Sequence, residues 1–217
     1  MAVQNKIVNV VLIGGGGHAR VLWDILARDT AYHVLGYADM AATPGISLDY
    51  LGKDEDVLTN FLPGDVCLVN GVGSVHLPLK RQAVFEFFKK KGYSFCRAVH
   101  PAAIISSQVV LGEGVQIAAG AVIGAGARLG DNVIINTAAS VDHDTIVGQH
   151  SHVAPGVTIS GGVVIGQGVH VGAGATIVQG VCLGDGVLVA AGAVVIRDVP
   201  ARCRIQGVPG KIYEIKR

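Results

Sequence analysis

The second half of the chain repeats a pattern every six residues, and this repeat constrains the fold more than any other feature. From Leu111 to Pro200 the sequence divides into fifteen hexads, and the first residue of each is Leu, Ile or Val. Because these residue types make up about a third of the segment, chance would give this pattern roughly once in ten million. The fifth residue is always Val, Ala, Thr or Ser, and Val99 and Ile105 extend the register toward the N-terminus.

A period of six predicts a β-solenoid, because it matches neither the 3.6-residue period of a helix nor the two-residue period of a flat strand. In a solenoid, three hexads form one triangular coil, and each leading aliphatic residue stacks on its counterpart one coil away. Glycine accounts for 31 of the 217 residues and falls mainly at the second and fourth hexad positions, where tight corners need a permissive backbone. With coils about 4.8 Å apart, five coils would form a prism roughly 25 Å tall.

The first hundred residues alternate predicted strands and helices instead. An apolar, β-branched strand at Lys6–Ile13 leads into the glycine run Gly14–Gly17, and helical spacing of apolar residues follows over His18–Arg28. Further predicted elements are strands at His33–Ala38 and Val66–Asn70, a helix at Leu77–Lys91 and a final strand at Tyr93–Val99. This alternation indicates a small parallel sheet. We therefore expect an α/β N-terminal Rossmann-like βαβ domain at residues 1–100. Residues 101–217 should form the solenoid, which ends in a short C-terminal tail.

Composition and charge argue against several classes of protein. Seventeen basic and sixteen acidic residues give a net charge of +1, which disfavours nucleic-acid binding through phosphate neutralisation. The mean hydropathy is +0.50, but no apolar run approaches the ~18 residues of a membrane span, and the N-terminus lacks a signal-peptide pattern. Cys67, Cys96, Cys182 and Cys203 are far apart and form no CxxC motif, so we expect four reduced, mostly buried thiols in a cytoplasmic protein.

The hexads resemble the repeat of the hexapeptide acyltransferases: Leu, Ile or Val, then a residue such as Gly or Ala, and a small residue at position five. Together with the glycine run that ends in His18, the chain is similar to the nucleotide-sugar acetyltransferases related to sialic acid O-acetyltransferase. The resemblance covers nearly the whole chain, including Gly207–Lys211, which is similar to a G-x-P-A-K element of these enzymes with Gly210 in place of the alanine.

The resemblance implies a left-handed parallel β-helix, although the general rule for parallel crossovers favours the right hand. It also implies a homotrimer, with acetyl-CoA in the cleft between adjacent helices and active sites between subunits. Hexads such as Ile117–Val122 and Val171–Thr176 place small residues on the prism faces, which suits close packing between helices.

His143 lies in Ser140–Asp144, at the third position of its hexad and therefore on a predicted turn. An imidazole titrates near neutrality and can take a proton from an amine or a hydroxyl, and an adjacent carboxylate can strengthen it as a base. In the similar N-acetyltransferases, the histidine of an Asn-Thr-x-x-x-x-x-His segment is the catalytic base and the following acidic residue raises its basicity. The segment begins at Asn136 here, so the resemblance implies that His143 is the base and that Asp144 supports it.

The resemblance also implies contacts with acetyl-CoA. Family members carry a histidine at the position of His152 that contacts the thioester end, and their backbone contacts correspond to Gly161, Ala173 and Ala191. Since Gly161 follows His143 by one coil, its N–H is expected to receive the thioester oxygen as negative charge develops.

The other histidines raise a rival interpretation. His170 follows His152 by one coil, so the two should stack, whereas His150 is expected at the surface. The γ-class carbonic anhydrases share this fold and hold zinc with three imidazoles that converge between subunits. His143, His152 and His170 would have to form such a site, but the anhydrases lack the N-terminal half and space their histidines differently. We therefore expect no metal.

The glycine run also permits phosphate binding. Gly14, Gly16 and Ala19 match the dinucleotide fingerprint between a predicted strand and helix, where backbone amides can meet a phosphate, and Asp39 lies at about the right distance to bind a ribose. The domain stops after three or four strands instead of completing a second nucleotide-binding half, which favours a nucleotide sugar over NAD.

The resemblance assigns roles to five residues of this domain. Gly16, Gly17 and His18 face the diphosphate or the sugar, Asp39 faces the base or ribose, and Gly71 contacts the sugar nucleotide. The UDP-sugar enzymes have an acidic pair where this chain has an alanine before Asp39. This departure makes a GDP-linked substrate more plausible, while both nucleotides stay open.

We therefore expect an acetyl-CoA-dependent N-acetyltransferase that acetylates the 4-amino group of a GDP- or UDP-linked 4-amino-4,6-dideoxy sugar. Transfer should be direct, because no Gly-x-Ser-x-Gly elbow and no Cys beside a His are present. Three alternatives stay open: O-acetylation of a sialic acid, which needs the same base, a carbonic anhydrase, and a non-catalytic solenoid scaffold.

Overall fold

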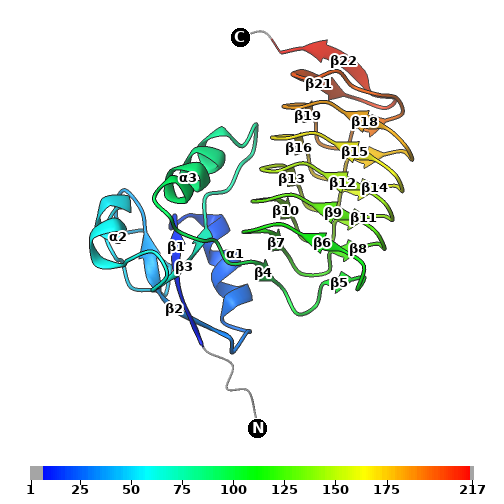
Figure 1. Cartoon of the computed structure of the whole chain (residues 1–217). Helices are drawn as coiled ribbons and strands as arrows, with labels where there is room; N and C mark the ends of the chain where they lie inside the picture. Colours follow the sequence, from blue (N-terminus) through cyan, green and yellow to red (C-terminus); the bar gives the residue numbers. More distant parts are fainter. Residues whose placement is uncertain (1–6, 216–217) are drawn as a thin grey trace.

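The computed structural model describes residues 7–215, in which a three-stranded sheet flanked by helices precedes a long solenoid (Figure 1). The N-terminal elements are β1 (Val8–Ile13), α1 (Gly17–Leu26), β2 (Tyr32–Ala38), α2 (Asp54–Asn60), β3 (Cys67–Asn70) and α3 (Leu79–Lys90). The strands are parallel, in the order β2-β1-β3. The parallel βαβ sheet is thus confirmed, and the five elements predicted between Lys6 and Lys91 agree to within two residues at each end, although Lys6 lies outside the described residues.

Both faces of this sheet are buried, as parallel sheets require. Alternate residues of β1 point to opposite sides: Val10 and Leu12 pack with the buried face of α1, whereas Val11 and Ile13 pack with α3, including Phe85. The β-branched, apolar composition of β1 follows from this central position.

Two features of this domain differ from expectation. Helix α2 was not predicted: it is short and buries only Val57, so it leaves almost no apolar period in the sequence. Its first turn is acidic, which suits the positive end of the helix dipole. The segment Tyr93–Val99 is not one strand of the sheet, because Phe95 makes a single bridge to Leu68 and Ala98–Val99 forms β4, the first strand of the solenoid.

The solenoid consists of three ladders of short strands. Apart from the last two strands of the first ladder, each strand has two residues and pairs with one eighteen residues away. The first ladder contains β4 (Ala98–Val99), β7 (Gln116–Ile117), β10 (Ile134–Ile135), β13 (His152–Val153), β16 (His170–Val171), β19 (Leu188–Val189) and β21 (Cys203–Gln206), with β22 (Lys211–Glu214) antiparallel at its end. The second contains β5 (Ile104–Ile105), β8 (Val122–Ile123), β11 (Ser140–Val141), β14 (Thr158–Ile159), β17 (Thr176–Ile177) and β20 (Val194–Val195). The third contains β6 (Val110–Leu111), β9 (Arg128–Leu129), β12 (Ile146–Val147), β15 (Val164–Ile165) and β18 (Cys182–Leu183). Strands β21 and β22 have four residues each, and β21 pairs with β19 at a separation of sixteen.

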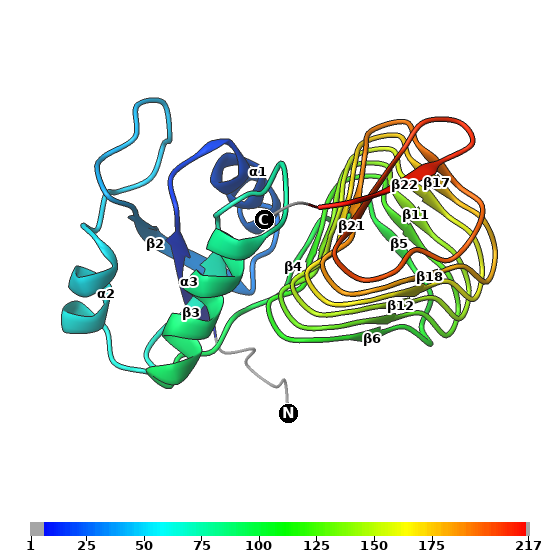
Figure 2. The same ribbon diagram turned by 90° about the horizontal axis from the view of Figure 1, so that it is seen from above.

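The hexad register accounts for the packing of this solenoid. The leading residues from Ile117 to Val195 are buried in one continuous core, together with the fifth residues. Most fourth positions are glycines with positive φ, and four consecutive hexads place other residues in the same left-handed conformation: Asn132, Ala138, Asp144 and His150. Seen from the C-terminal end in Figure 2, the chain runs clockwise from β4 through β5 to β6 while the coils rise toward the viewer, so the winding is left-handed.

The N-terminal domain packs against the first ladder, near its lower coils (Figures 1 and 2). Three outward-facing residues of this ladder, Gln116, Ile134 and His152, are therefore buried. The guanidinium of Arg81 on α3 is fully buried and donates hydrogen bonds to the backbone carbonyls of Asn132 and His150 on the solenoid. Its burial lowers the pKa of Arg81 to about 9.

His150 is buried rather than exposed, so the expectation of a surface residue was wrong. The aromatic ring of Phe85 on α3 lies edge-on to its imidazole, with ring centroids 5.5 Å apart, and only 4% of the residue is exposed. Burial, followed by the nearby charge of Arg81, lowers the pKa of His150. The hexad pattern places His150 on a corner but gives no sign that α3 covers that corner.

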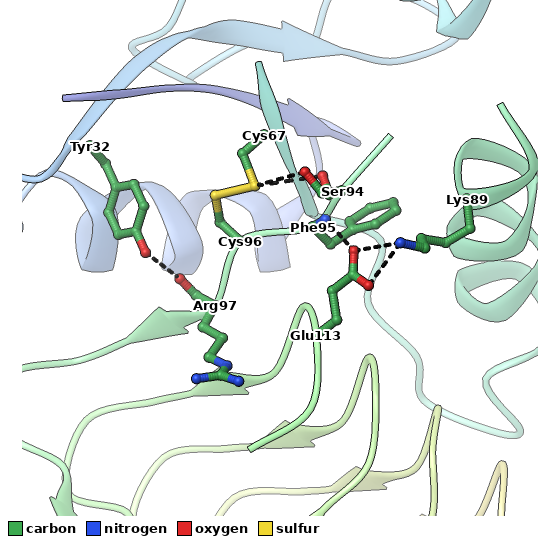
Figure 3. The surroundings of a disulfide bond; sticks show 8 residues. All are labelled: Tyr32, Cys67, Lys89, Ser94, Phe95, Cys96, Arg97 and Glu113. Carbon is green, nitrogen blue, oxygen red and sulfur yellow. Dashed lines mark hydrogen bonds and ion pairs between the residues drawn. A yellow bond between two sulfur atoms is a disulfide. The ribbon is translucent and has the colours of Figure 1, made fainter. Parts of the chain in front are cut away.

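The expectation of four reduced thiols was also wrong. Cys67 and Cys96 form a disulfide with a Cα–Cα distance of 5.7 Å (Figure 3), Cys182 is exposed and Cys203 is buried. The physical reason is the bridge between Leu68 and Phe95, which aligns the two cysteine-bearing segments. Close by in Figure 3, the carboxylate of Glu113 accepts hydrogen bonds from Lys89 and from the N–H of Phe95, and so joins the two domains.

Between residues 7 and 215, none of the helices has the length and apolar character needed to traverse a membrane.

Candidate active site

A pocket of about 330 Å³ lies at the carboxyl ends of the three sheet strands, and we call it the strand-end pocket. All five residues expected to contact the nucleotide sugar line it: Gly16, Gly17, His18, Asp39 and Gly71. Helix α1 begins there with no side-chain cap and no acidic residue in its first turn, so its N-terminal amides are available to an anion. A Cβ atom built on Gly16 or Gly17 would meet nothing within 4 Å, so the space beside these residues is open.

Asp39 is fixed by the loop that follows β1. One of its carboxylate oxygens accepts a hydrogen bond from the N–H of Gly15 at 2.8 Å, and the other accepts one from the N–H of Met40 at 2.7 Å. Asp54 and Lys80 also line the strand-end pocket, and the sequence interpretation missed both. Burial, followed by the charges of acidic neighbours that include Asp39, raises the pKa of Asp54.

His18 joins the strand-end pocket to the solenoid. Its Nε2 lies 2.6 Å from Oε1 of Gln116, whose amide in turn donates to the carbonyl of Asn70 at 2.8 Å. Because Oε1 only accepts, Nε2 of His18 carries the proton. Burial, more than the charge of Arg81, lowers the pKa of His18, so the ring is neutral at pH 7.

A larger cleft of about 780 Å³ lies between the N-terminal domain and the first ladder, and we call it the interdomain cleft. It shares Gly17, His18 and Gly73 with the strand-end pocket, so the two are adjacent. Three of the four residues expected to contact acetyl-CoA line it: His152, Ala173 and Ala191. The fourth, Gly161, does not line it.

His152 is held by hydrogen bonds at both ring nitrogens. Its Nδ1 lies 2.9 Å from Oγ and 3.0 Å from the carbonyl oxygen of Ser74, and its Nε2 lies 3.2 Å from Nδ2 of Asn136. The side-chain oxygen of Asn136 accepts from the N–H of Thr137, which orients the amide. Since Nδ2 of Asn136 only donates, Nε2 of His152 accepts, and Nδ1 carries the proton toward the Ser74 carbonyl.

His170 stacks on His152, as the register predicts. The two residues are direct partners in the first ladder, and their rings meet edge to face with centroids 5.0 Å apart. His170 lines the interdomain cleft and is only 6% exposed, yet its Nδ1 has no hydrogen-bond partner in the described structure. Burial is the main reason that the pKa of His152 falls to about 3 and that of His170 to about 4, so both rings are neutral at pH 7.

His143 and Asp144 form a pair on the turn between β11 and β12. Oδ2 of Asp144 lies 2.9 Å from Nδ1 of His143, while Asp142 accepts a hydrogen bond from the backbone N–H of His143. Of the two neighbouring carboxylates, Asp144 is therefore the one that binds the imidazole ring. The imidazole is 54% exposed, and its pKa is raised by the hydrogen bond to Asp144 first and by the charge of Asp142 second. With Nδ1–H donating to Asp144, Nε2 is left as the proton acceptor.

Gly161 lies against this imidazole. A Cβ atom on Gly161 would approach Nε2 of His143 to 2.4 Å, so glycine leaves the space that the ring occupies. Within residues 7–215, the N–H groups of Gly161, Ala173 and Ala191 donate no hydrogen bond; Ala173 and Ala191 are exposed, whereas Gly161 is buried against the ring of His143.

The pair at His143 and the two pockets lie on different sides of a single chain. Strands β11 and β12 belong to the second and third ladders, and Figure 2 places the corner between these faces away from the N-terminal domain. Consistent with this, His143 lines neither pocket. In one chain, His143 therefore does not converge with His152 and His170, and the described residues contain no cluster of three or more His, Cys, Asp or Glu that could hold a metal.

Comparisons with known proteins agree with this architecture. Residues 9–86 match the family model of the PglD N-terminal domain, and residues 96–185 match the model of the GMPPB C-terminal domain. A search of curated protein sequences gives no significant match.

Several solved structures are similar over nearly the whole chain. PerB from Caulobacter crescentus, in complex with CoA and GDP-perosamine, is 36% identical with a TM-score of 0.86, and the match covers 96% of this chain and 98% of PerB. The acetyltransferase domain of PglB from Neisseria gonorrhoeae, in complex with acetyl coenzyme A, is 31% identical with a TM-score of 0.87, covering 94% of this chain and 98% of that domain. AntD, an N-acyltransferase from Bacillus cereus, is only 16% identical, with a TM-score of 0.51 over 61% of this chain and 88% of AntD, and so supports the fold alone.

The likeness to PerB and to the PglB domain exceeds 30% identity and spans both halves of the molecule. The protein is therefore an acetyl-CoA-dependent acyltransferase, and it belongs to the PglD-like family of hexapeptide-repeat β-helix sugar N-acetyltransferases.

Proposed function

We propose that this chain transfers the acetyl group of acetyl-CoA to the 4-amino group of a nucleotide-linked 4-amino-4,6-dideoxy sugar. One observation carries the proposal: the residues expected to bind a nucleotide line the strand-end pocket, and three of those expected to bind acetyl-CoA line the adjacent interdomain cleft. The bound GDP-perosamine and CoA in PerB, which is 36% identical, support the same pair of substrates.

In the proposed reaction, the sugar amine attacks the thioester carbonyl while Nε2 of His143 takes a proton from the amine. Asp144 holds the ring and stabilises the imidazolium that forms. The N–H of Gly161 donates to the oxyanion of the tetrahedral intermediate, which collapses to the amide as the CoA thiolate leaves and receives the proton. Alignment of two bound substrates supplies much of the acceleration, and general base catalysis adds about 10²–10⁴-fold.

This reaction requires a second copy of the chain, because His143 lies on a corner remote from the pockets of its own chain. We propose a homotrimer in which each copy presents this corner to the interdomain cleft of its neighbour. Exposed aliphatic residues support such contacts: Ile104 and Val122 project from the second ladder, and Val110, Ile146 and Val164 project from the third. Apolar groups gathered in this way on a solenoid face are typical of interaction surfaces.

The proposal favours a GDP-linked sugar over a UDP-linked one. A carboxylate can accept two adjacent N–H donors from the edge of guanine, whereas uracil offers one donor between two carbonyls. The strand-end pocket contains the carboxyl groups of Asp39 and Asp54, together with the amine of Lys80, which can donate to a carbonyl of the base.

An assay of candidate acceptors tests the proposal. Purified protein is incubated with acetyl-CoA and either GDP-perosamine, a UDP-linked 4-amino-4,6-dideoxy sugar or a sialic acid, and both released CoA and acetylated product are measured. We expect turnover with an amino sugar, fastest with the GDP-linked one. Turnover of the sialic acid alone would replace the proposal with O-acetylation, and the absence of a thermal shift with CoA would favour a non-catalytic scaffold.

A further inference from the structure

The outward-facing residues of the first ladder form a column along the interdomain cleft. Direct partners in this column, one coil apart, are His152, His170, Leu188 and Arg204, and all four line the cleft. The loop at Ser74 contacts His152 and stops short of hydrogen bonding to His170. Within this column, His152 is therefore bound by the N-terminal domain, whereas the next residue, His170, faces the cleft without such a hydrogen bond.

The two stacked histidines differ in what they can offer to a ligand. Both ring nitrogens of His152 are hydrogen-bonded, Nδ1 to Ser74 and Nε2 to Asn136. A ligand can therefore make van der Waals contact with this ring, but it cannot hydrogen-bond to it without breaking one of these bonds. Nδ1 of His170 is buried and has no partner in the described structure. An unpaired buried nitrogen costs free energy, and a small rotation of the ring that brings this nitrogen to a hydrogen-bonding ligand in the cleft would remove this cost.

We propose that His170 is a positioning residue of the acyl-donor site, and that its ring hydrogen-bonds an amide of the pantetheine arm of acetyl-CoA. This inference rests on the proposed function, since it assigns the interdomain cleft to the acyl donor. It adds a polar contact on the pantetheine arm to the contact with the thioester end that the resemblance implies for His152.

The walls of the cleft favour the pantetheine arm over the sugar. On the solenoid side they consist largely of small or apolar residues, among them Pro155, Gly172, Ala173, Leu188 and Ala191. A pantetheine arm is a mostly apolar chain with two amides, so one or two polar contacts satisfy it, whereas a sugar presents several hydroxyls that each need a partner.

The charge state of His170 suits an amide. His76 and Arg81 are the charged or titratable groups whose fields lower its pKa, after burial, and the pKa of about 4 leaves the ring neutral. A neutral imidazole has one N–H donor and one acceptor nitrogen, and an amide offers one of each in return. The interaction should therefore be independent of pH between about 6 and 8.

The test compares His170→Leu with His170→Asn, because leucine fills the space without a hydrogen bond and asparagine retains one. His33→Leu is the matched control, since His33 is exposed on β2 and lines neither pocket. The affinity for CoA is measured by calorimetry without any acceptor sugar, and KM and kcat are then measured for both substrates. A thermal melt establishes that each variant is folded.

We expect His170→Leu to weaken CoA binding and to raise the KM for acetyl-CoA about five- to tenfold, the loss of one hydrogen bond, with kcat and the KM for the amino sugar little changed. His170→Asn should recover most of the affinity, and His33→Leu should behave as wild type. Unchanged CoA affinity in folded His170→Leu, or a change confined to the KM of the amino sugar, would overturn the inference. If wild-type protein binds no CoA, the proposed function itself fails, so the two failures are distinguishable.

Discussion

At His143, the carboxylate of Asp144 determines which ring nitrogen is free to accept a proton. Asp144 binds Nδ1 and so leaves Nε2 as the basic nitrogen, and the two acidic neighbours raise the pKa of the ring. Asp144 occupies the corner position with φ of 57°, where most hexads have glycine. Asparagine and aspartate tolerate this left-handed conformation better than other residues with side chains.

This geometry predicts the effect of Asp144→Asn on the pH dependence of kcat/KM. The base must be unprotonated to act, so activity rises with pH through the pKa of His143. Removal of the carboxylate charge lowers that pKa toward 6.5, so the acidic limb of the profile should move to lower pH while the maximum rate falls. The measurement is a profile between pH 5 and 9, and a limb that stays in place would show that Asp144 does not support the base.

Gly161 provides a second prediction at the residue scale. In Gly161→Ala, the added methyl group would lie only 2.4 Å from Nε2 of His143, so the ring must swing away from the amide that it faces. We expect kcat to fall at least tenfold with little change in CoA affinity. Gln179→Ala, one coil further at the same corner, is the control, and equal loss of activity in both variants would contradict this account.

At the scale of elements, the hexad repeat contains most of the information about the solenoid. Because one residue in six must fill the core of every coil, the register, the stacking of His152 on His170 and the adjacency of Gly161 and His143 could all be read from the sequence. The N-terminal strands and long helices also leave clear patterns, whereas α2 buries too little surface to leave one.

What the sequence could not reveal depends on contacts between the two domains. The burial of His150, the bridge from Ser74 to His152 and the position of Arg81 arise only when α3 and the loop before it pack on the first ladder. The hexad pattern could have drawn attention to His170, because it faces outward, but its unpaired Nδ1 depends on where the N-terminal domain ends.

This packing predicts acid sensitivity. The pKa values of His152 and His170 are about 3 and about 4 in the folded protein and near 6.5 when unfolded, so between these values the unfolded chain binds more protons. Stability from this source is complete above pH 6.5 and is lost progressively as the pH falls toward 4. His18 and Arg81 face His152, and His76 and Arg81 face His170, and none of these groups offers a negative charge to offset the effect.

Thermal melts between pH 7.5 and 4.5 measure this effect. We expect the wild-type Tm to fall steadily below pH 6.5 and to fall less in His152→Asn, which has one fewer titrating group. Parallel Tm curves for the two proteins would mean that the buried histidine does not drive the loss of stability.

At the scale of the whole molecule, the proposed mechanism divides each site between two copies of the chain. The strand-end pocket lies in the N-terminal domain and the interdomain cleft beside it, whereas His143, the proposed base, lies on a corner that this domain does not reach. The proposed active site is therefore composite: one copy of the chain supplies the nucleotide pocket and an adjacent copy supplies His143.

Complementation between two inactive variants is the most direct test of whether adjacent copies of the chain share one active site. Gly16→Asp places a carboxylate in the open space at the start of α1 and should repel the diphosphate, while His143→Asn should remove the base and leave CoA binding intact. Each variant alone should be nearly inactive. After co-refolding or co-expression in equal amounts, about a quarter of the sites should combine an intact pocket with an intact base, so activity should recover to about a quarter of the wild-type value. Mixed oligomers that form but remain inactive would contradict the account, because they would place both groups in the same chain's site.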